Sequence, residues 1–511
     1  MFSPPAGPAW RGHLIALLAG AITPFSLAPY NIWPLALLGA GLLSLVLQGL
    51  NARASIARAA VFGLGLFGTG ASWVFVSIHD YGNSSLPLAL ALTLLFVAAM
   101  ALIFALPFYA YGRWFSQRPL GMLAAFPALW VLGEWLRSWF LTGFPWLYLG
   151  YGHLDTPLAG WAPVGGVFAL SLVCVFTAAV LAQLVDGGWR QRHTQFALAL
   201  TATLWLGGWG LQQQSWTQPQ GDKLRVGLVQ PNIPQEMKWR PDFREPTLAR
   251  LRTMSAPLWD HDWVIWSEAA IPMLYHHAGT FLSEMHERAA TTNTALITGI
   301  LYDDFHERRY YNSVLGLGTA LGIYHKQRLV PFGEYVPLES WLRGLIAFFD
   351  LPTSIISTGP EQQRPLQIGN LFLSPSICYE VVYPDLVARG ATAAHVLLTI
   401  SNDAWFGDSI GPLQHMEMAQ MRSLETGRYM IRATNNGVSG IVAPNGQMTQ
   451  QTDQFQQQTL SAEIQPMQGR TPFMSWGSWP VVGCAGLLLT LALVYHPSRA
   501  QHSRHRRSQT A

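Results

Sequence analysis

The sequence predicts a membrane protein that combines an α-helical transmembrane bundle of eight spans with an α/β domain outside the bilayer. Hydrophobic residues make up 50% of the 511 residues and charged residues only 12%, about half the usual share in a soluble protein. Long uncharged apolar runs fill the first 212 residues, where no lysine occurs. After residue 213, short apolar runs alternate with more polar stretches, which is typical of an α/β domain.

Eight apolar segments are expected to cross the bilayer, because most of them approach the ~20 residues that span its hydrocarbon core. They lie near residues 13–29, 33–50, 57–78, 88–112, 120–141, 161–184, 195–211 and 479–495. The first two are short and are interrupted by Pro24, Pro29 and Pro34. A cleaved signal peptide is the alternative for the first segment, but seven further spans follow it and no small-residue cleavage site is evident.

The connections between these segments predict the orientation of the chain. Alternate connections carry arginine, whereas the loops 79–87 and 142–160 carry no lysine or arginine. The arginines are Arg11, Arg53, Arg58, Arg113, Arg118, Arg190 and Arg192. By the positive-inside rule both termini lie in the cytoplasm, and the region 213–478 lies on the opposite face. In the inner membrane of a Gram-negative cell, that face is the periplasm.

The apolar segments divide the chain into three predicted parts. A membrane domain of seven helices covers residues 1–212, an outer catalytic domain covers 213–478, and an eighth helix with a basic cytoplasmic tail covers 479–511. The net charge of +3 comes largely from this tail, between Arg499 and Arg507. Beside a membrane segment, such a tail indicates topology rather than nucleic-acid binding. No nucleic-acid partner is therefore expected.

The outer domain is predicted to hold a sheet that is covered by helices on at least one face. Strand-like runs occur at 224–229, 263–266, 295–301, 313–317, 371–374 and 395–400. Helical or loop stretches lie between them near 241–256, 280–292, 381–390 and 412–431, and the Gln-rich stretch 448–458 is expected to be a surface loop.

The fifth apolar segment contains two charged residues, Glu134 and Arg137. Charges inside a membrane are costly and often functional. Their three-residue spacing also permits a plain ion pair along one helix face, which we favour. The following loop, 142–160, contains aromatic residues that fit either an interfacial belt or a lipid entrance.

Cys378 is the residue on which the chemistry of the outer domain is expected to depend. Cys174 and Cys484 lie inside apolar segments, and three cysteines do not make a disulfide framework. Cys378 lies between the strand-like run 371–374 and a possible helix at 381–389. At such a turn the amides of the new helix favour a thiolate. The alternative is a small buried apolar residue without chemistry.

Two further residues with complementary chemistry are predicted to follow strands. Glu268 follows the apolar run 263–266, and Lys326 follows 322–325. Alone, each is an ordinary strand end. With Cys378 they supply a base for the thiol proton, an ammonium for an oxyanion and a nucleophile for an acyl carbon. Because ligand sites gather at the carboxyl ends of strands, we expect the three side chains to meet there.

These motifs resemble the nitrilase superfamily of carbon–nitrogen hydrolases, which has a Glu-Lys-Cys triad. The resemblance lies in Ser267-Glu268, His325-Lys326 with Pro331-Phe-Gly-Glu334-Tyr-Val-Pro, Ile377-Cys378-Tyr-Glu380, and Ser401-Asn-Asp-Ala-Trp405-Phe-Gly. With the eight membrane spans, the resemblance extends over essentially the whole chain to the apolipoprotein N-acyltransferase family of Gram-negative inner membranes.

The resemblance implies a nitrilase-like αββα sandwich and a two-step acyl transfer. Cys378 would take an acyl chain from a phospholipid, with phosphatidylethanolamine as the expected donor, and form a thioester. The α-amine of the diacylglyceryl-cysteine of an apolipoprotein would then attack, which completes lipoprotein maturation. Glu268 would be the general base, and Lys326 with the backbone N–H of Tyr379 would stabilise the oxyanion. No metal or diffusible cofactor is implied.

The resemblance also implies supporting roles. Glu334 would orient Lys326 or assist proton transfer, its alternative being a structural turn residue. Trp239 lies at a family position near the acyl site, and Asn312 matches a family asparagine. Glu380 would either orient the site or form an ordinary salt bridge. Four histidines, at positions 276, 277, 325 and 415, leave open a Cys–His enzyme, although no motif supports one.

Two other functions stay open at this point. A membrane-anchored nitrilase-type amidase would use the same triad with water as the second nucleophile, although a small-molecule hydrolase gains nothing from eight spans. A transporter or membrane scaffold is the non-enzyme alternative, but the spans lack the repeated broken helices of a transport pathway. The expected partners are the lipid bilayer, the phospholipid donor and the diacylated apolipoprotein, and a monomer is expected.

Overall fold

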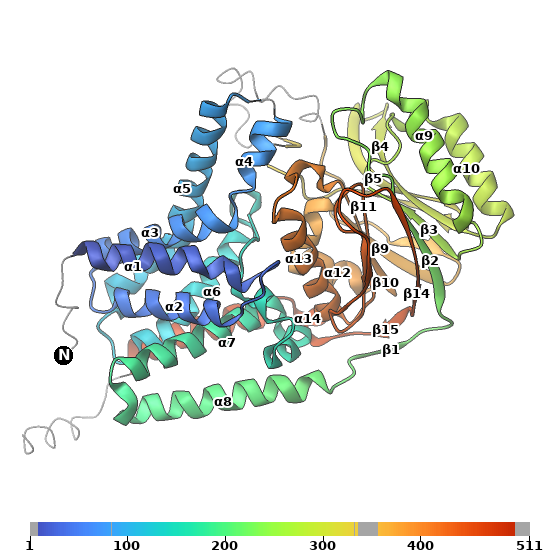
Figure 1. Ribbon diagram of the computed structural model, residues 1–511. Coiled ribbons are helices and arrows are strands. Elements are labelled where there is room, and N and C mark those ends of the chain that lie inside the picture. Colours follow the sequence, from blue (N-terminus) through green and yellow to red (C-terminus); the bar gives the residue numbers. More distant parts are fainter. Residues whose placement is uncertain (1–8, 83, 332, 336–355, 496–511) are drawn as a thin grey trace, which may run out of the picture.

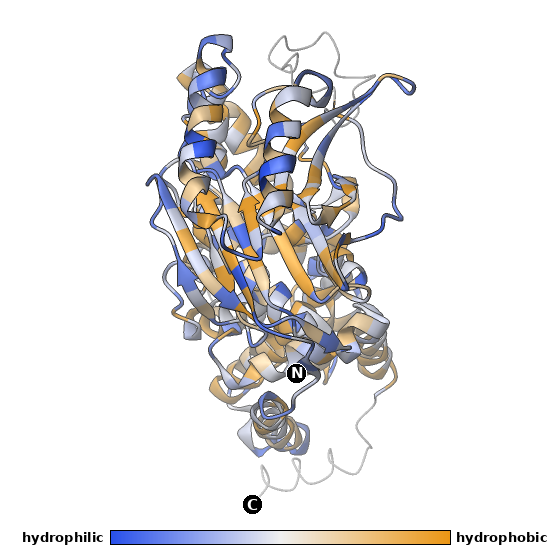
Figure 2. Ribbon diagram, turned by 90° about the vertical axis from the view of Figure 1, so that its right-hand side faces the viewer, coloured by the Kyte–Doolittle hydropathy of each residue, from blue (hydrophilic) through white to orange (hydrophobic). Residues whose placement is uncertain are grey.

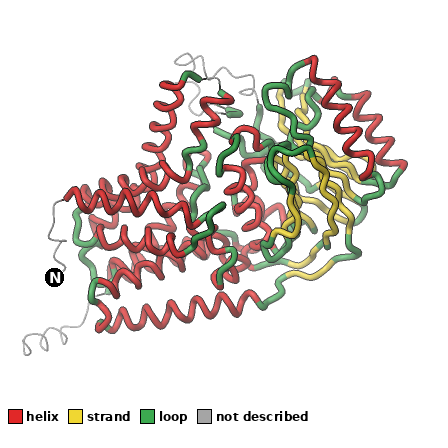
Figure 3. The backbone as a smooth tube through the Cα atoms, in the orientation of Figure 1, coloured by secondary structure: helices red, strands yellow, loops and turns green. Residues whose placement is uncertain are grey.

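The computed structural model describes residues 9–82, 84–331, 333–335 and 356–495. Most helices gather on one side of the molecule, and the strands lie on the other side with further helices packed around them (Figure 3). In Figure 1 the blue to teal helices of the N-terminal part lie together with the green helix α8, and most of the later chain, from green to orange, forms the α/β part beside them. The basic tail that the sequence predicts after residue 496 lies outside the described residues.

The N-terminal part is helical, and each predicted apolar segment contains a helix. The main helices are α1 (Ala9–Ile22), α2 (Pro34–Leu47), α3 (Ala52–Gly70), α4 (Val74–Val76), α5 (Leu86–Ala110), α6 (Phe126–Arg137), α7 (Ala162–Val185), α8 (Arg192–Gln212) and α15 (Trp479–Val494). Their starts follow local rules: the Asn51 side chain accepts a hydrogen bond from the Ala54 N–H and caps α3, while Pro34 begins α2.

Length and composition identify fewer spans than the eight predicted. Among the described residues, Leu86–Phe115 and Pro157–Val185 are long and apolar enough to cross a membrane. A third span results if Ala52–Gly70 and Val74–Tyr81, bent by 64° relative to each other, are taken together. The helices Pro34–Leu47 and Trp479–Val494 are apolar but shorter. The helical character of the segments is confirmed, and the number of spans stays a prediction.

Several of these helices expose large apolar side chains. The exposed fraction is 67% for Leu94 in α5, 69% for Phe196 in α8 and 72% for Leu487 in α15. So many exposed large apolar side chains are unusual on a protein surrounded by water. The helical part therefore has a surface suited to hydrocarbon.

The α/β part contains two large sheets. The six-stranded sheet has the order β14-β2-β3-β4-β5-β7 and the seven-stranded sheet the order β13-β12-β11-β10-β9-β8-β6. The first is formed by β2 (Leu224–Gln230), β3 (Trp263–Trp266), β4 (Ala295–Asp304), β5 (Arg309–Gly318), β7 (Ile323–His325) and β14 (Gln458–Ile464). The second is formed by β6 (Ala320–Leu321), β8 (Leu366–Ile368), β9 (Leu371–Ile377), β10 (Val396–Ser401), β11 (Met430–Thr434), β12 (Gly440–Val442) and β13 (Met448–Gln451). A short ribbon pairs β1 (Thr217–Pro219) with β15 (Met467–Gly469).

The two sheets pack face to face and helices cover their outer sides. Apolar residues such as Val226, Ile265, Ile377 and Ile400 fill the layer between the sheets. The helices α9 (Pro241–Ser255) and α10 (Gly279–Thr291) pack on the six-stranded sheet. On the seven-stranded sheet lie α12 (Pro384–Ala391) and α13 (Gly411–Thr426). In Figure 2 several strands are almost continuously hydrophobic, while the covering helices are mixed. The predicted αββα sandwich is confirmed.

The stretch near 412–431, expected to be helical or a loop, forms the helix α13 up to Thr426 and a short loop beyond it. The helix ends there because Gly427 adopts a left-handed conformation with φ +60°, and Met430 begins β11. The prediction for the Gln-rich stretch was wrong. The Gln-rich stretch expected to be a loop contains the edge strand β13, whose side chains are mostly exposed. Polar side chains are common on such edges, since they prevent pairing with other molecules.

The helix α13 joins the sandwich to the helical part. The Gln414 side chain accepts hydrogen bonds from the indole N–H groups of Trp73 (3.2 Å) and Trp146 (2.9 Å). The carboxylate of Glu417 accepts from the Ala28 N–H at 3.0 Å, and that of Glu425 accepts from the Val167 N–H at 2.8 Å. One helix of the α/β part therefore accepts hydrogen bonds from backbone and side-chain donors of several elements in the helical part.

The intramembrane ion pair favoured for Glu134 and Arg137 is wrong. Glu134 Oε1 instead accepts from the indole of Trp130 at 3.0 Å and from the Leu149 N–H at 3.1 Å. Arg137 Nη1 donates to the Trp146 carbonyl at 2.9 Å. Within the described residues, the Glu134 carboxylate and the Arg137 guanidinium form no ion pair with each other, and their hydrogen bonds go to other groups. The side chains of Glu134 and Arg137 thus both bind backbone groups of the loop after α6, which folds back against the helix.

Candidate active site

The three predicted catalytic residues come from the carboxyl ends of three strands in two different sheets. Glu268 follows β3 and Lys326 follows β7, both in the six-stranded sheet, while Cys378 follows β9 in the seven-stranded sheet. The strand β4 is parallel to β3, and β5 is antiparallel to both β4 and β7. The strands β3 and β7 therefore point in the same direction, and their ends meet at one edge.

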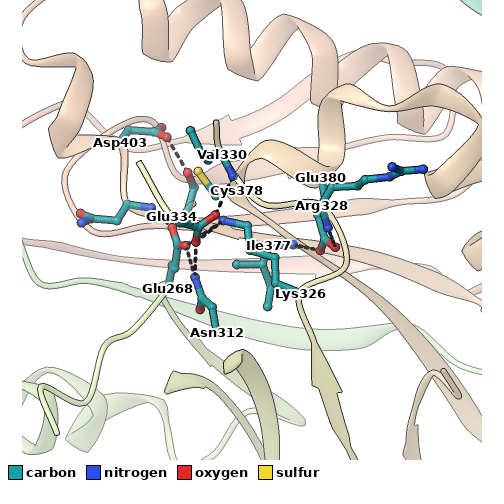
Figure 4. A network of polar contacts seen from close by, with 12 residues as sticks. Glu268, Asn312, Lys326, Arg328, Val330, Glu334, Ile377, Cys378, Glu380 and Asp403 are labelled. Atoms are coloured by element: carbon teal, nitrogen blue, oxygen red, sulfur yellow. Dashed lines mark hydrogen bonds and ion pairs between the residues drawn. The ribbon is translucent and has the colours of Figure 1, made fainter. Parts of the chain in front are cut away.

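The ammonium group of Lys326 lies between two carboxylates. Its Nζ is 2.8 Å from Oε1 of Glu334 and 3.6 Å from Oε1 of Glu268. The amide of Asn312 donates to the same two oxygens, at 3.2 Å and 2.7 Å. Figure 4 shows these side chains converging with the Cys378 sulfur beside them. Burial alone would lower the pKa of Lys326, but the charges of Glu334 and Glu268 outweigh it and raise that pKa, so the side chain is a cation.

A strained turn presents Glu268. The following residue, Ala269, has φ +43°, a left-handed conformation that is uncommon for a residue with a side chain. Glu268 Oε2 accepts from the Asn402 N–H at 2.7 Å, and the Glu268 carbonyl accepts from Nζ of Lys238 at 3.0 Å. A Cβ at Gly299 would lie 2.5 Å from the Ala269 nitrogen, so glycine is needed there. Asn402 and Lys238 therefore hold Glu268 in place through its carboxylate and its carbonyl.

Cys378 is a partly buried residue in a left-handed conformation, with φ +51°. Burial, followed by the negative charge of Glu268, raises its pKa to about 12, although the charge of Lys326 acts in the opposite direction. The predicted thiolate is therefore wrong for the resting site. The helix that follows, Cys378–Val382, is a short 3₁₀ turn, and its dipole is too small to offset desolvation. The sulfur needs a base before it can attack.

The other predicted site residues divide into two groups. Glu334 and Asn312 contact the triad directly, as described above. Tyr379 is buried and donates its hydroxyl hydrogen to the Gly143 carbonyl at 2.9 Å, while its ring stacks on Trp146 with centroids 6.1 Å apart. Trp239 has 43% of its surface exposed. Its neighbour Lys238, which the prediction omitted, is the residue that contacts Glu268.

Glu380 forms a clamp between the two loops of the site rather than a salt bridge. Its Oε2 accepts from the Ile377 N–H at 2.7 Å, and its Oε1 accepts from the N–H groups of Gln327 at 2.5 Å and Arg328 at 3.2 Å. The Tyr324 hydroxyl also donates to Oε1, at 3.0 Å. Burial raises the pKa of Glu380 to about 7. The residue therefore fixes the loop after Lys326 against the strand that ends at Cys378.

A second polar cluster lies behind Cys378, on the side of α13, and sequence reasoning missed it as a unit. It consists of Ser401, Asp403, His415 and Arg432. The Arg432 guanidinium lies 2.7 Å from Asp403 Oδ2, and the charge of Arg432 helps to hold the pKa of Asp403 well below its usual range despite burial. His415 Nε2 lies 3.1 Å from the Cys378 carbonyl oxygen, so its contact is with the backbone. In the sequence, the Ser401-Asn-Asp motif and His415 indicate separate members of this cluster, and nothing there indicates that they meet.

The sandwich and its three converging side chains define a protein of the nitrilase class. Residues 225–471 match the carbon–nitrogen hydrolase family and residues 19–180 match the apolipoprotein N-acyltransferase N-terminal domain. Apolipoprotein N-acyltransferase of Pseudomonas aeruginosa is 48% identical over 504 residues, covering 97% of this chain and 98% of the relative. That of Coxiella burnetii is 39% identical, covering 94% and 99%. The chain belongs to the apolipoprotein N-acyltransferase family.

Solved structures also align with part of the chain. Saccharomyces cerevisiae Nit3, a member of the nitrilase superfamily, aligns with a TM-score of 0.38 at 16% identity, over 55% of this chain and 98% of its own. A carbon–nitrogen hydrolase from Helicobacter pylori aligns with a TM-score of 0.37 at 15% identity, over 48% and 89%.

Proposed function

We propose that this protein transfers an acyl chain from a phospholipid to the N-terminal α-amine of the diacylglyceryl-cysteine of apolipoproteins. The observation that carries the proposal is the convergence of Glu268, Lys326 and Cys378 at one buried point between the two sheets. Membership of the apolipoprotein N-acyltransferase family supports the same reaction. The apolar surface of the helical part fits a donor and an acceptor that both reside in a bilayer.

The first half-reaction forms a thioester on Cys378. Glu268 takes the thiol proton as Sγ attacks the ester carbonyl of the phospholipid, a step that a thiol with a pKa of about 12 cannot make unaided at neutral pH. The carbonyl oxygen becomes an oxyanion that Lys326 and the backbone N–H of Tyr379 stabilise. When the tetrahedral intermediate collapses, the glycerol oxygen leaves with the proton held by Glu268, and a lysophospholipid is released.

The second half-reaction transfers the acyl chain to nitrogen. The α-amine of the diacylglyceryl-cysteine attacks the thioester carbonyl, and Glu268 accepts the proton of the amine and returns it to the departing sulfur. The same two donors stabilise the second oxyanion. An ester and a thioester are close in energy whereas an amide is more stable, so the second step makes the overall transfer run forward.

The supporting residues act on the triad rather than on the substrate. Glu334 keeps the Lys326 ammonium oriented at 2.8 Å, and Asn312 holds both carboxylates through its amide. Glu380 fixes the two loops of the site through backbone N–H groups. Trp239 is exposed near the turn that carries Lys238, where an aromatic surface suits an acyl chain.

We further propose that the chain is a multi-pass protein of the Gram-negative inner membrane with eight spans. The membrane domain covers residues 1–212, the catalytic domain covers 213–478 in the periplasm, and residues 479–511 form the last span and a cytoplasmic tail. The alternating arginines between the segments support this orientation. The apolar helices and their exposed leucines support membrane insertion.

One experiment tests the reaction. The purified protein is incubated with phosphatidylethanolamine and a diacylated lipopeptide, and mass spectrometry follows Cys378 and the peptide. We expect a hydroxylamine-sensitive acyl adduct on Cys378, because hydroxylamine cleaves thioesters, and an N-acylated peptide. Release of free fatty acid without N-acylated peptide would instead indicate a hydrolase of the amidase type. Absence of any adduct would overturn the proposed function.

A further inference from the structure

We propose that His415 is a positioning residue that holds the peptide group between Cys378 and Tyr379, so that the Tyr379 N–H faces the reacting carbonyl. The proposal rests on the proposed function, because it concerns the oxyanion donor of that reaction. In a Cys–His enzyme the histidine takes the proton of the thiol. Here His415 instead contacts the backbone carbonyl of Cys378.

The His415 ring is held firmly against the nucleophile. Its side chain is fully buried on α13, and its Nε2 lies 3.1 Å from the Cys378 carbonyl oxygen. The ring centroids of Trp146 and Phe406 lie 5.7 Å and 6.0 Å from that of His415. A carbonyl oxygen can only accept, so Nε2 carries the hydrogen of this bond. The aromatic neighbours leave the ring little freedom to turn.

The other ring nitrogen fixes the tautomer. Arg432 Nη2 lies 3.0 Å from Nδ1, and Asp403 Oδ1 lies 3.3 Å from it. A guanidinium only donates, so Nδ1 accepts from Arg432 and the imidazole is neutral. The Asp403 oxygen is already bound by the Ser401 hydroxyl at 2.6 Å. Burial and the charge of Arg432 lower the pKa of His415, which agrees with a neutral ring that donates through Nε2.

The hydrogen bond to the Cys378 carbonyl determines where the next N–H points. A peptide group is planar, and its C=O and N–H point in opposite directions. With the carbonyl directed at α13, the Tyr379 N–H is directed away from it. Tyr379 lies in the first turn of the 3₁₀ helix Cys378–Val382, where N–H groups have no partner within the helix. Polarisation of the carbonyl also strengthens the donor at the other end of the peptide.

The backbone of Cys378 explains why such an anchor is needed. Its φ of +51° is disfavoured for any residue with a side chain, so the turn requires contacts that hold it. His415 supplies one on the carbonyl side, and Glu380 supplies another through the Ile377 N–H at 2.7 Å. Without the histidine, the peptide could rotate and turn the Tyr379 N–H away from the substrate.

Two amide substitutions separate the contacts of the two ring nitrogens. In His415→Gln the amide nitrogen occupies the place of Nε2 and can still donate to the Cys378 carbonyl. In His415→Asn it occupies the place of Nδ1, within reach of Arg432 and Asp403 but not of that carbonyl. Acylation of Cys378 by phosphatidylethanolamine is measured in single turnovers. His306→Gln, in an exposed turn, is the matched control.

We expect the Gln variant to acylate within about fivefold of the wild-type rate, since it retains a neutral donor. The Asn variant should be slower by about 10²-fold, the usual cost of losing one oxyanion donor. Alkylation of Cys378 by iodoacetamide involves no oxyanion, so the Asn variant should keep an alkylation rate within about threefold of wild type. A defect confined to acylation would indicate a misdirected Tyr379 N–H, whereas a general disturbance of Cys378 would slow alkylation as well.

Three results would overturn the inference. They are a folded Gln variant as slow as the Asn variant, an Asn variant with the wild-type acylation rate, and an Asn variant whose alkylation falls as much as its acylation. Thermal unfolding in detergent verifies folding, and the Gln variant keeps the test decisive if the Asn variant does not fold. Lack of an adduct on wild-type Cys378 would instead refute the proposed function.

Discussion

Nζ of Lys326 lies 2.8 Å from Oε1 of Glu334, closer than it lies to the carboxylate of Glu268. Glu334 therefore carries much of the ionic pairing of the lysine and leaves Glu268 able to accept a proton. In Glu334→Gln we expect Lys326 to pair with Glu268 instead. Glu268 is then less able to accept the thiol proton, so thioester formation should slow by about 10–10²-fold. Single-turnover acylation measures this rate, with Glu307→Gln at an exposed ion pair as the control. An unchanged rate would limit Glu334 to a structural role.

Removal of each triad group should block a different part of the reaction. Cys378→Ala should give neither adduct nor N-acylated peptide, because no nucleophile remains. Glu268→Gln and Lys326→Met should lower the acylation rate by at least about 10³-fold, since they remove the base and the charged oxyanion donor. Mass spectrometry of the Cys378 peptide provides the measurement. Wild-type turnover in either variant would exclude that residue from its assigned role.

Cys378 should behave as a protonated thiol in the absence of substrate. Its pKa is raised to about 12, so the thiolate fraction and the rate of alkylation by iodoacetamide should rise about tenfold per pH unit from pH 7 to 10. Lys326→Met should raise this pKa further, because Lys326 favours the thiolate. Rates are measured on the Cys378 peptide, which excludes Cys174 and Cys484. A plateau near pH 7 would contradict the expectation.

Lys238 should matter for the base although it touches no substrate. Its Nζ holds the Glu268 carbonyl at 3.0 Å beside the strained Ala269, and burial lowers its pKa to about 8. Lys238→Met should slow acylation by about tenfold or more, because the turn that carries Glu268 loses a hydrogen bond. Lys223→Met, at an exposed ion pair, is the matched control. Equal acylation rates for both variants would show that Lys238 does not contribute to the position of Glu268.

The contact between α13 and the helical part should weaken as the pH rises. Burial raises the pKa of Glu417 from 4.5 to about 8, so folding favours its protonated form. The associated stability is complete below pH 4.5 and is lost as the pH rises through about 8. Glu417→Gln should stabilise the protein at pH 9 by roughly 1–3 kcal/mol relative to wild type. Thermal unfolding at pH 5 and pH 9 measures the difference, and an equal pH dependence in both proteins would contradict it.

The sequence predicts the chemistry of the site better than its environment. Glu268, Lys326 and Cys378 each follow an apolar run, so a strand-end rule finds them without coordinates. The thiolate expected for Cys378 is wrong because the sequence indicates the helix that follows but not the factors that raise the pKa of the thiol. Those factors are burial and the approach of Glu268 from another sheet.

Contacts between distant segments explain the remaining differences. Lys238 and His415 touch backbone carbonyls of Glu268 and Cys378, and no spacing rule predicts such contacts. Lysine occurs only at positions 223, 238 and 326, and this scarcity favours a specific role for Lys238. The pairing predicted for Glu134 and Arg137 fails similarly, because the loop that takes their hydrogen bonds folds back from further along the chain.

The division of the triad between the two sheets makes the thickness of the apolar layer a determinant of reactivity. Glu268 and Lys326 follow strands of one sheet, and Cys378 follows a strand of the other. Truncation of a buried side chain such as Ile400 would weaken the packing between the two sheets and allow one sheet to shift relative to the other. Turnover should then disappear on warming before the protein melts, so that heat sensitivity of the enzyme reports on sheet alignment rather than on unfolding.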